Sequence, residues 1–119
     1  MKGIGTDIVD VERIKKSHKR WGEKFLKRLF TENELSYCSG KYPQLAGRFA
    51  AKEAVMKALG VGFPSILFSD IEIVSDGNSP PSVNLLNRAK KIQEEKDISS
   101  VFISLSHIDD KACGFAIAV

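Results

Sequence analysis

The sequence contains no hydrophobic run that could cross a membrane. A membrane-spanning helix needs about 18 or more consecutive apolar residues, and no stretch of the 119-residue chain approaches that length. The chain starts Met-Lys-Gly-Ile-Gly, without the basic head and apolar core of a secretory signal peptide. These absences predict a soluble, cytoplasmic protein that does not act on a membrane.

Cysteine is scarce as well. Cys38 and Cys113 are the only two cysteines, they are far apart in the sequence, and neither belongs to a C-x-x-C motif. Two cysteines cannot form the disulfide framework typical of small secreted domains. The pattern therefore indicates a reducing compartment.

Nucleotide-binding motifs of the glycine-rich kind are also missing. The sequence has no phosphate-binding loop, no dinucleotide fingerprint and no repeated βαβ pattern. A net charge of +3 is mild, and does not by itself indicate a nucleic-acid partner. The length and pattern predict a single α+β domain over residues 1–119, with mostly antiparallel strands and helices packed on one side.

What the sequence does contain is a strong helix-forming stretch over residues 47–60, in which Gly60 is expected to end the helix. Small residues fill one broad side of this helix: Ala50, Ala51, Ala54, Val55 and Ala58. Phe49 and Met56 form a second apolar patch, and the narrow strip between the two holds only Glu53 and Lys57. A helix that is apolar nearly all round is a buried helix, so this strip faces the interior or a cleft.

Two interpretations of Glu53 and Lys57 remain open. As an exposed ion pair four residues apart, they would stabilise the helix by about 0.3–0.5 kcal/mol. Their apolar flanks argue against this, because desolvating both charges costs more than an exposed pair returns. The alternative is that Glu53 binds a metal ion and Lys57 binds a phosphate.

The N-terminal residues 2–9 are predicted to form a strand. Gly3 and Gly5 share a face with Asp7, and their lack of side chains allows a ligand or another backbone to approach closely. Mg²⁺ is commonly bound by one or two carboxylates together with substrate phosphates and water. Asp7 and Glu53 together are therefore candidate magnesium ligands.

A helix is predicted from Val11 to about Phe30, with Asp10 as its N-cap and with Gly22 as a point at which it could kink or divide. Apolar residues, Trp21 and Phe25 among them, follow one face, and the opposite face carries a stripe of cations: Arg13, Lys16, Arg20, Lys24 and Lys27. Such a stripe is either an ordinary solvated face or a docking surface for an acidic partner. Nucleic-acid binding is disfavoured, because aromatic residues are expected among the cations of such a site.

The remaining segments predict short elements. A capping box at Thr31-Glu32-Asn33-Glu34 opens a helix that ends near Cys38. Strands are expected over residues 68–75, 82–85, 101–106 and 112–119, with a helix over residues 86–96. His107 ends the third of these strands.

Two segments closely resemble a known family. Residues 48–60, Arg-Phe-Ala-Ala-Lys-Glu-Ala-x-x-Lys-Ala-x-Gly, resemble the signature helix of the 4′-phosphopantetheinyl transferases. Residues 3–14, Gly-Ile-Gly-Thr-Asp-Ile-Val-Asp-x-x-Arg-Ile, resemble the N-terminus of its short holo-acyl-carrier-protein synthase branch. The two motifs stand in the family's order, and the resemblance extends from residue 3 to about residue 119.

The resemblance implies a reaction and its partners. The phosphopantetheine arm of coenzyme A would be transferred to a serine of apo acyl carrier protein, with Mg²⁺ as cofactor, in fatty acid biosynthesis. The family's fold and its homotrimer, which has active sites between subunits, are implied as well.

The resemblance also implies roles for individual residues. Asp7 and Glu53 would bind Mg²⁺, and Lys57 would act with them in catalysis by neutralising phosphate charge. The base is either Glu53 or a water molecule on the metal. Coenzyme A would be bound by Arg48, Lys57 and His107, and the carrier protein by Arg13, Lys16, Arg20 and Lys24. The family's Asn-Gly-Lys-Pro turn is replaced by Asn-Ser-Pro-Pro at residues 78–81, so the lysine contact of that turn is missing.

Overall fold

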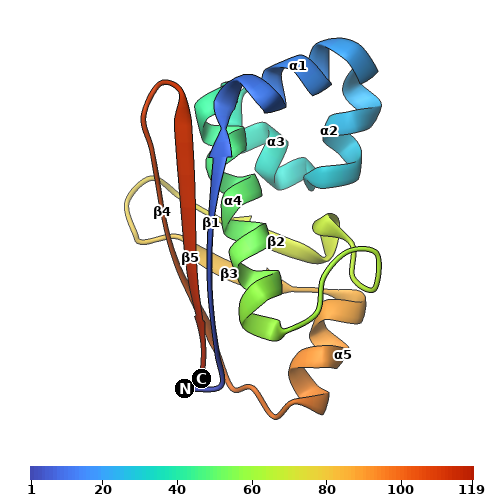
Figure 1. The fold of residues 1–119 in the computed structure, drawn as a ribbon, viewed down its shortest axis with the longest axis vertical. Helices are drawn as coiled ribbons and strands as arrows, with labels where there is room; N and C mark the ends of the chain where they lie inside the picture. Colours follow the sequence, from blue (N-terminus) through green and yellow to red (C-terminus); the bar gives the residue numbers. More distant parts are fainter.

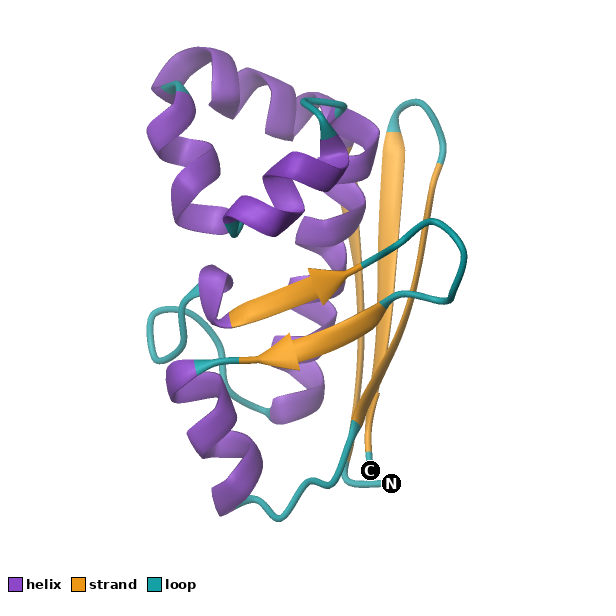
Figure 2. Cartoon of the chain, turned by 180° about the vertical axis from the view of Figure 1, so that it is seen from behind, coloured by secondary structure: helices purple, strands orange, loops and turns teal.

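The computed structural model, which describes residues 1–119, places the two ends of the chain side by side in one antiparallel sheet (Figure 1). β1 (Gly3–Asp10) pairs along its length with β5 (Lys111–Ala118), and β5 pairs on its other edge with β4 (Val101–His107). Helices cover only one face of this sheet (Figures 1 and 2). The predicted α+β fold is therefore confirmed.

The central helix, α4 (Tyr42–Leu59), packs directly on the inner face of this sheet. Its small residues face three glycines, Gly3, Gly5 and Gly114, at which an added Cβ would collide with the helix backbone. The predicted small-residue side of α4 thus permits backbone-to-backbone packing, because no large side chain lies between the helix and the sheet. Gly60 ends the helix in the left-handed conformation (φ 75°), as expected for a C-terminal stop.

A second, two-stranded sheet contains β2 (Ile71–Val74) and β3 (Ser82–Leu85). Its Ile71 and Ile73 share the main hydrophobic core with α4. The predicted strand began at Phe68, but the segment Phe68–Asp70 forms a short 3₁₀ turn (η1) before β2. α5 (Asn87–Glu95) follows, within the range predicted for this helix, and buries Ala89 and Ile92.

The helix predicted from Val11 to about Phe30 is divided at Gly22, the point at which a kink or division was expected. The chain forms α1 (Val11–Trp21) and α2 (Glu23–Leu29), separated by Gly22 with φ 74°. This left-handed conformation, which glycine adopts readily, turns the chain, so the apolar face does not continue across the break. Trp21, predicted to face the core, is therefore 61% exposed.

The third helix, α3 (Glu32–Cys38), begins with the predicted capping box. The Thr31 side chain accepts a hydrogen bond from the Glu34 backbone, and the Glu34 carboxylate accepts one from the Thr31 backbone. Asp10 stands at the predicted N-cap of α1, but its side chain makes no capping hydrogen bond. It pairs instead with Lys111 at 2.7 Å.

The outer face of the three-stranded sheet is not covered by any helix (Figures 1 and 2). It carries exposed apolar side chains, among them Ile4, Ile8, Phe102 and Phe115. None of the helices combines the length and the apolar character needed to traverse a bilayer.

Candidate functional site

Three of the predicted site residues come together at the edge of the sheet where α4 lies against β1. We call Asp7, Glu53 and Lys57 the edge cluster. The Lys57 ammonium donates to the Thr6 carbonyl oxygen at 2.8 Å and lies 3.4 Å from Asp7 Oδ1. Gly5 makes room for this arrangement, since a Cβ there would collide with Lys57.

Glu53 is the unpaired member of the edge cluster. It forms no ion pair within 4 Å and no hydrogen bond, so the simple Glu53–Lys57 ion pair is absent. Partial burial raises the pKa of the Glu53 carboxyl group, and the nearby negative charge of Asp7 raises it further, against the opposing effect of Lys57 and Arg13. The carboxylate is thus desolvated, close to a second carboxylate, and free to bind a ligand.

The edge cluster suits a hard divalent cation. No three His, Cys, Asp or Glu side chains gather into a complete protein-only metal site. Mg²⁺ does not require one, because it commonly keeps water and phosphate ligands beside one or two carboxylates. The repulsion between Asp7 and Glu53, visible in the raised pKa of Glu53, is what a bound cation would relieve.

Arg48 lies in a different environment from a surface arginine. Only 5% of it is exposed, its guanidinium donates to Ser75 Oγ at 2.9 Å, and it stacks on the Tyr37 ring at 4.8 Å. Tyr37 and Ser75 also line a cavity of about 410 Å³. Both were missed by the sequence reasoning, because nothing in the local pattern brings α3, α4 and the end of β2 together.

His107, at the end of β4, is exposed and lies beside Gly47, the residue before Arg48. Arg48 and His107, two of the three predicted coenzyme-binding residues, therefore share one region, and the third, Lys57, lies in the edge cluster. Glu53 follows Arg48 by five residues, which places it about 140° around the helix and about 7.5 Å along it. The edge cluster and the Arg48–His107 region thus face different sides of α4 within one chain.

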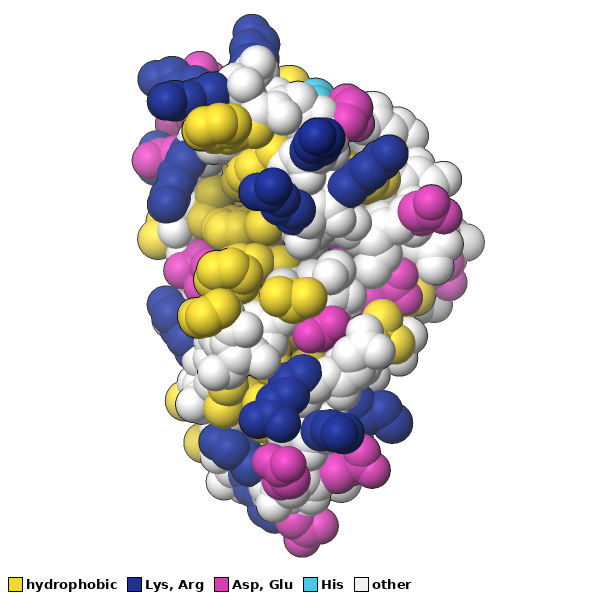
Figure 3. Space-filling model, turned by 90° about the vertical axis from the view of Figure 1, so that its right-hand side faces the viewer, with side chains coloured by type: hydrophobic (Ala, Val, Ile, Leu, Met, Phe, Trp, Pro, Cys, Tyr) yellow, Lys and Arg dark blue, Asp and Glu magenta, His cyan; other side chains and the backbone are white.

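The predicted carrier-binding cations are all exposed, but they do not form one straight stripe. Arg13, Lys16 and Arg20 lie on α1, and Lys24 lies beyond the break at Gly22. Arg20 stacks over the exposed Trp21 ring at 4.8 Å, and Trp21 and Lys24 line a cavity of about 290 Å³. Figure 3 shows hydrophobic side chains running down this side of the molecule, with Lys and Arg side chains on both sides of them.

A second lysine of α4 forms a buried ion pair that was not predicted. The Lys52 ammonium donates to Glu34 at 2.7 Å and to the carbonyl oxygens of Phe68 and Ile71 at 2.9 and 2.7 Å. Neither side chain of the pair is exposed. Burial lowers the pKa of Lys52, and the charge of Glu34 counteracts this effect. This buried pair links α3, α4 and the start of β2.

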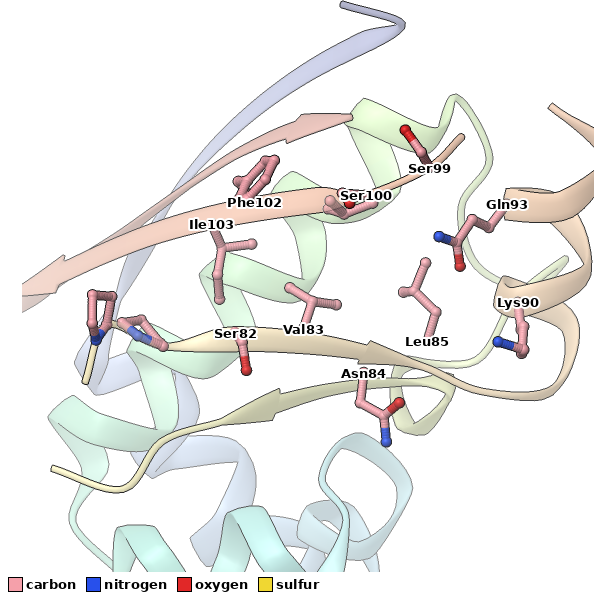
Figure 4. Close-up of a pocket in the computed structure, with 13 residues that line it drawn as sticks. Ser82, Val83, Asn84, Leu85, Lys90, Gln93, Ser99, Ser100, Phe102 and Ile103 are labelled. Atoms are coloured by element: carbon pink, nitrogen blue, oxygen red, sulfur yellow. The ribbon is translucent and has the colours of Figure 1, made fainter. Parts of the chain in front are cut away.

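Another cavity, of about 450 Å³, lies between β3 and β4 (Figure 4). Val83 and Leu85 point from β3 toward β4, and Ile103 points back toward β3, whereas Phe102 points away. Lys90 is the only ionisable side chain among its walls. None of the predicted site residues lines this cavity, so it is not the candidate active site.

Comparison with known proteins identifies the family of this chain. A family model described as the 4′-phosphopantetheinyl transferase superfamily matches residues 3–116. The holo-[acyl-carrier-protein] synthase of Halothermothrix orenii is 42% identical over 120 residues, covering 98% of this chain and 96% of that protein.

Two solved structures are similar over nearly the whole chain. The holo-[acyl-carrier-protein] synthase of Neisseria meningitidis has a TM-score of 0.90 and 38% identity, covering 100% of this chain and 98% of that chain. The Helicobacter pylori synthase, solved in complex with coenzyme A, has a TM-score of 0.88 and 36% identity, with 98% and 99% covered.

Proposed function

The chain belongs to the 4′-phosphopantetheinyl transferase superfamily, and from this premise we propose that it is a holo-[acyl-carrier-protein] synthase. It transfers the 4′-phosphopantetheine arm of coenzyme A to a serine of apo acyl carrier protein and releases adenosine 3′,5′-bisphosphate. The observation that carries the proposal is the unpaired, partly buried Glu53 beside Asp7 and Lys57. We assign the reaction to fatty acid biosynthesis, in the cytoplasm, with residues 1–119 acting as one domain.

The edge cluster positions the reacting groups. The serine oxygen forms a bond to the phosphorus of the arm, the bond from that phosphorus to the oxygen of the adenosine phosphate breaks, and the serine proton is taken up by Glu53. Lys57, with one N–H not used within the chain, donates to the phosphate oxygens as their charge shifts.

Asp7 and Glu53 are the residues that would bind Mg²⁺. When bound, the ion neutralises negative charge on the pyrophosphate. Glu53→Gln and removal of Mg²⁺ are therefore both expected to stop transfer.

Coenzyme A is also bound by Arg48, Lys57 and His107. Arg48 uses only part of its five-donor guanidinium on Ser75 and Gln44, which leaves donors for an anionic group of the nucleotide. Arg48 and Glu53 face different sides of α4. We therefore expect one coenzyme A molecule to bind between two subunits, in contact with Arg48 of one and Glu53 of the other.

This arrangement requires a homo-oligomer, and we propose the trimer of the family. The exposed apolar residues on the outer face of the three-stranded sheet support self-association, because an uncovered apolar face of this kind is typical of an interface. The mass in solution, measured by light scattering, tests the trimer directly.

The acyl carrier protein docks on the cations of α1 and α2. Arg13 contributes to the electrostatics of Glu53, so this surface adjoins the edge cluster. The double variant Arg13→Glu and Arg20→Glu is expected to raise the KM for the carrier steeply, with little change in the KM for coenzyme A. Equal damage to both constants would mean that these residues serve the nucleotide.

One assay separates this function from a nucleic-acid-binding or purely structural module. The protein is incubated with apo acyl carrier protein, coenzyme A and Mg²⁺, and the carrier is weighed by mass spectrometry. Addition of a phosphopantetheine mass is expected, and the Glu53→Gln variant is the matched control. A carrier of unchanged mass with the wild-type protein would overturn the proposal.

A further inference from the structure

One side chain joins three helices at the corner between α1 and α2. His18, in the last turn of α1, lies with Nδ1 2.8 Å from the hydroxyl oxygen of Tyr42 and with Nε2 2.9 Å from Oε1 of Glu23. Glu23 is the first residue of α2, and Tyr42 is the first residue of α4. We call these three residues the His18 clamp.

The donors and acceptors of the His18 clamp fit one another. A carboxylate only accepts hydrogen bonds, so Nε2 of His18 carries the hydrogen and donates it to Glu23. Nδ1 then accepts a hydrogen bond from the Tyr42 hydroxyl group. The two rings also pack edge to face, with 5.7 Å between their centroids, which is a favourable arrangement of aromatic rings.

Few other contacts fix this corner, which lies at the opposite end of the molecule from the chain termini (Figure 1). Between Ile14 of α1 and Leu26 of α2 no side chain is fully buried, and Phe25 packs on the core only in part. At Gly22 no atom of another segment lies within 4 Å of the position that a Cβ would take. The angle between α1 and α2 therefore depends strongly on the His18 clamp.

The corner separates two groups of the cations proposed to bind the carrier protein. Arg13 precedes the buried Ile14, which anchors that part of α1, whereas Lys24 follows the break at Gly22. One acidic partner can contact cations on both helices only when the angle between the helices fits it. A surface that already has this angle avoids the cost of ordering it on binding.

We propose that His18 is a positioning residue for carrier recognition, an inference that rests on the proposed transfer function. By holding Glu23 and Tyr42, it favours one angle at the break and fixes the cations of α2 relative to those of α1. Tyr42 begins the helix that carries the edge cluster, so the same clamp also sets the docking surface relative to Glu53. His18 acts through the helices that it joins.

The first test asks whether His18 and Lys24 act together. His18→Ala is expected to raise the KM for the carrier protein about fivefold, the equivalent of one exposed charge contact, with kcat and the KM for coenzyme A unchanged. Lys24→Ala should raise the carrier KM in the wild-type protein but have little further effect in the His18→Ala protein. Arg13→Ala is the matched control, and its effect should be the same in both backgrounds.

Glu23→Ala tests the clamp by the sign of its effect. The Glu23 side chain is 71% exposed, so the variant should fold, which a thermal melt checks. By charge alone, removing an acid from a cationic surface would lower the KM for an acidic carrier. The clamp predicts a higher KM, because α2 loses its link to His18.

His18→Gln is the conservative control. Its amide keeps a donor for Glu23 and an acceptor for Tyr42, so it should restore most of the wild-type KM for the carrier. A full effect of Lys24→Ala in the His18→Ala protein, a lower KM in Glu23→Ala, or an equal rise in the KM for coenzyme A overturns the inference while the transfer function stands. Loss of transfer in the wild-type protein overturns both.

Discussion

Two lysines of the same helix, Lys52 and Lys57, have opposite environments. Lys52 has no exposed side-chain surface, and its three N–H groups donate to one carboxylate and two carbonyl oxygens. Lys57 is more than half exposed and has one close acceptor, the Thr6 carbonyl oxygen, and one weaker contact with Asp7. A lysine whose donors are all used stabilises the fold, whereas a lysine with a free donor can bind a substrate anion.

The carboxylates differ in the same way. Glu34, the partner of Lys52, accepts hydrogen bonds from Lys52 and from the backbone of Thr31 and Ile73. Glu53 accepts none. The buried pair is therefore complete within the chain, whereas the edge cluster leaves Glu53 without a partner.

Replacing the unpaired carboxylate is expected to have the largest effect on activity. Glu53→Gln should reduce transfer below detection, because it removes both the proposed proton acceptor and a proposed metal ligand. The melting temperature should stay the same or rise slightly, since burial disfavours the charged form of Glu53. Mass-spectrometric assays and thermal melts measure the two quantities, and unchanged transfer at limiting Mg²⁺ would contradict the assignment.

Breaking the buried pair should have the largest effect on stability. Lys52→Met is expected to lower the free energy of unfolding by about 3–5 kcal/mol, because it leaves Glu34 charged, buried and without its partner. Urea denaturation measures this loss. The double variant Lys52→Met and Glu34→Gln is the control and should recover part of it; a double variant no more stable than the single one would show that the pairing of charges is not the cause.

The free lysine should affect activity more than stability. Lys57→Met is expected to lower kcat by about 10²-fold, as for the loss of an electrostatic stabiliser in the transition state. Its exposed contact with Asp7 is worth about 1 kcal/mol or less, so the free energy of unfolding should change little. An unchanged kcat would mean that the contact with Asp7 is merely structural.

The smallest effect concerns a thiol near the buried pair. Burial raises the pKa of Cys38 to about 11, and the charge of Glu34 adds to this, while Arg48 and Lys52 counteract it. In a Cys113→Ser background, Cys38 should react with a thiol reagent at pH 8 only very slowly, because the thiolate is the reactive form. Lys52→Met should accelerate the reaction by loosening the packing of this region. Equal rates in the two proteins would show that the buried pair does not protect Cys38 from the reagent.

Much of the fold could be predicted because its signals are local. The capping box at Thr31 and the stop at Gly60 are set by neighbouring residues, and both are confirmed. The edge cluster was found because Glu53 and Lys57 stand out in an otherwise apolar helix. The family resemblance added Asp7 as a second metal ligand beside Glu53. The structure brings Asp7 to 3.4 Å from Lys57, and the binding of a metal stays a prediction.

The features that were missed depend on contacts between distant segments. In the sequence, Lys52 is one charged residue of a helix. No local pattern shows that its side chain pairs in the core with Glu34, 18 residues away. Gly22 was recognised as a potential break, but the direction of the turn, which exposes Trp21, depends on how α1 and α2 pack. The roles of all the predicted site residues remain predictions: those of the edge cluster, of Arg48 and His107, and of the carrier-binding cations.

The three glycines beneath α4 determine how the molecule can move. Since Gly3, Gly5 and Gly114 bring the sheet backbone against the helix backbone, the helix cannot slide or rotate on the sheet without a collision between main chains. We therefore expect the amides of α4 to exchange with deuterium only when the whole domain unfolds. We expect the motion that admits coenzyme A or releases product to occur in the segment after Gly60 and at the break at Gly22. These two parts lie on the two sides of the rigid core.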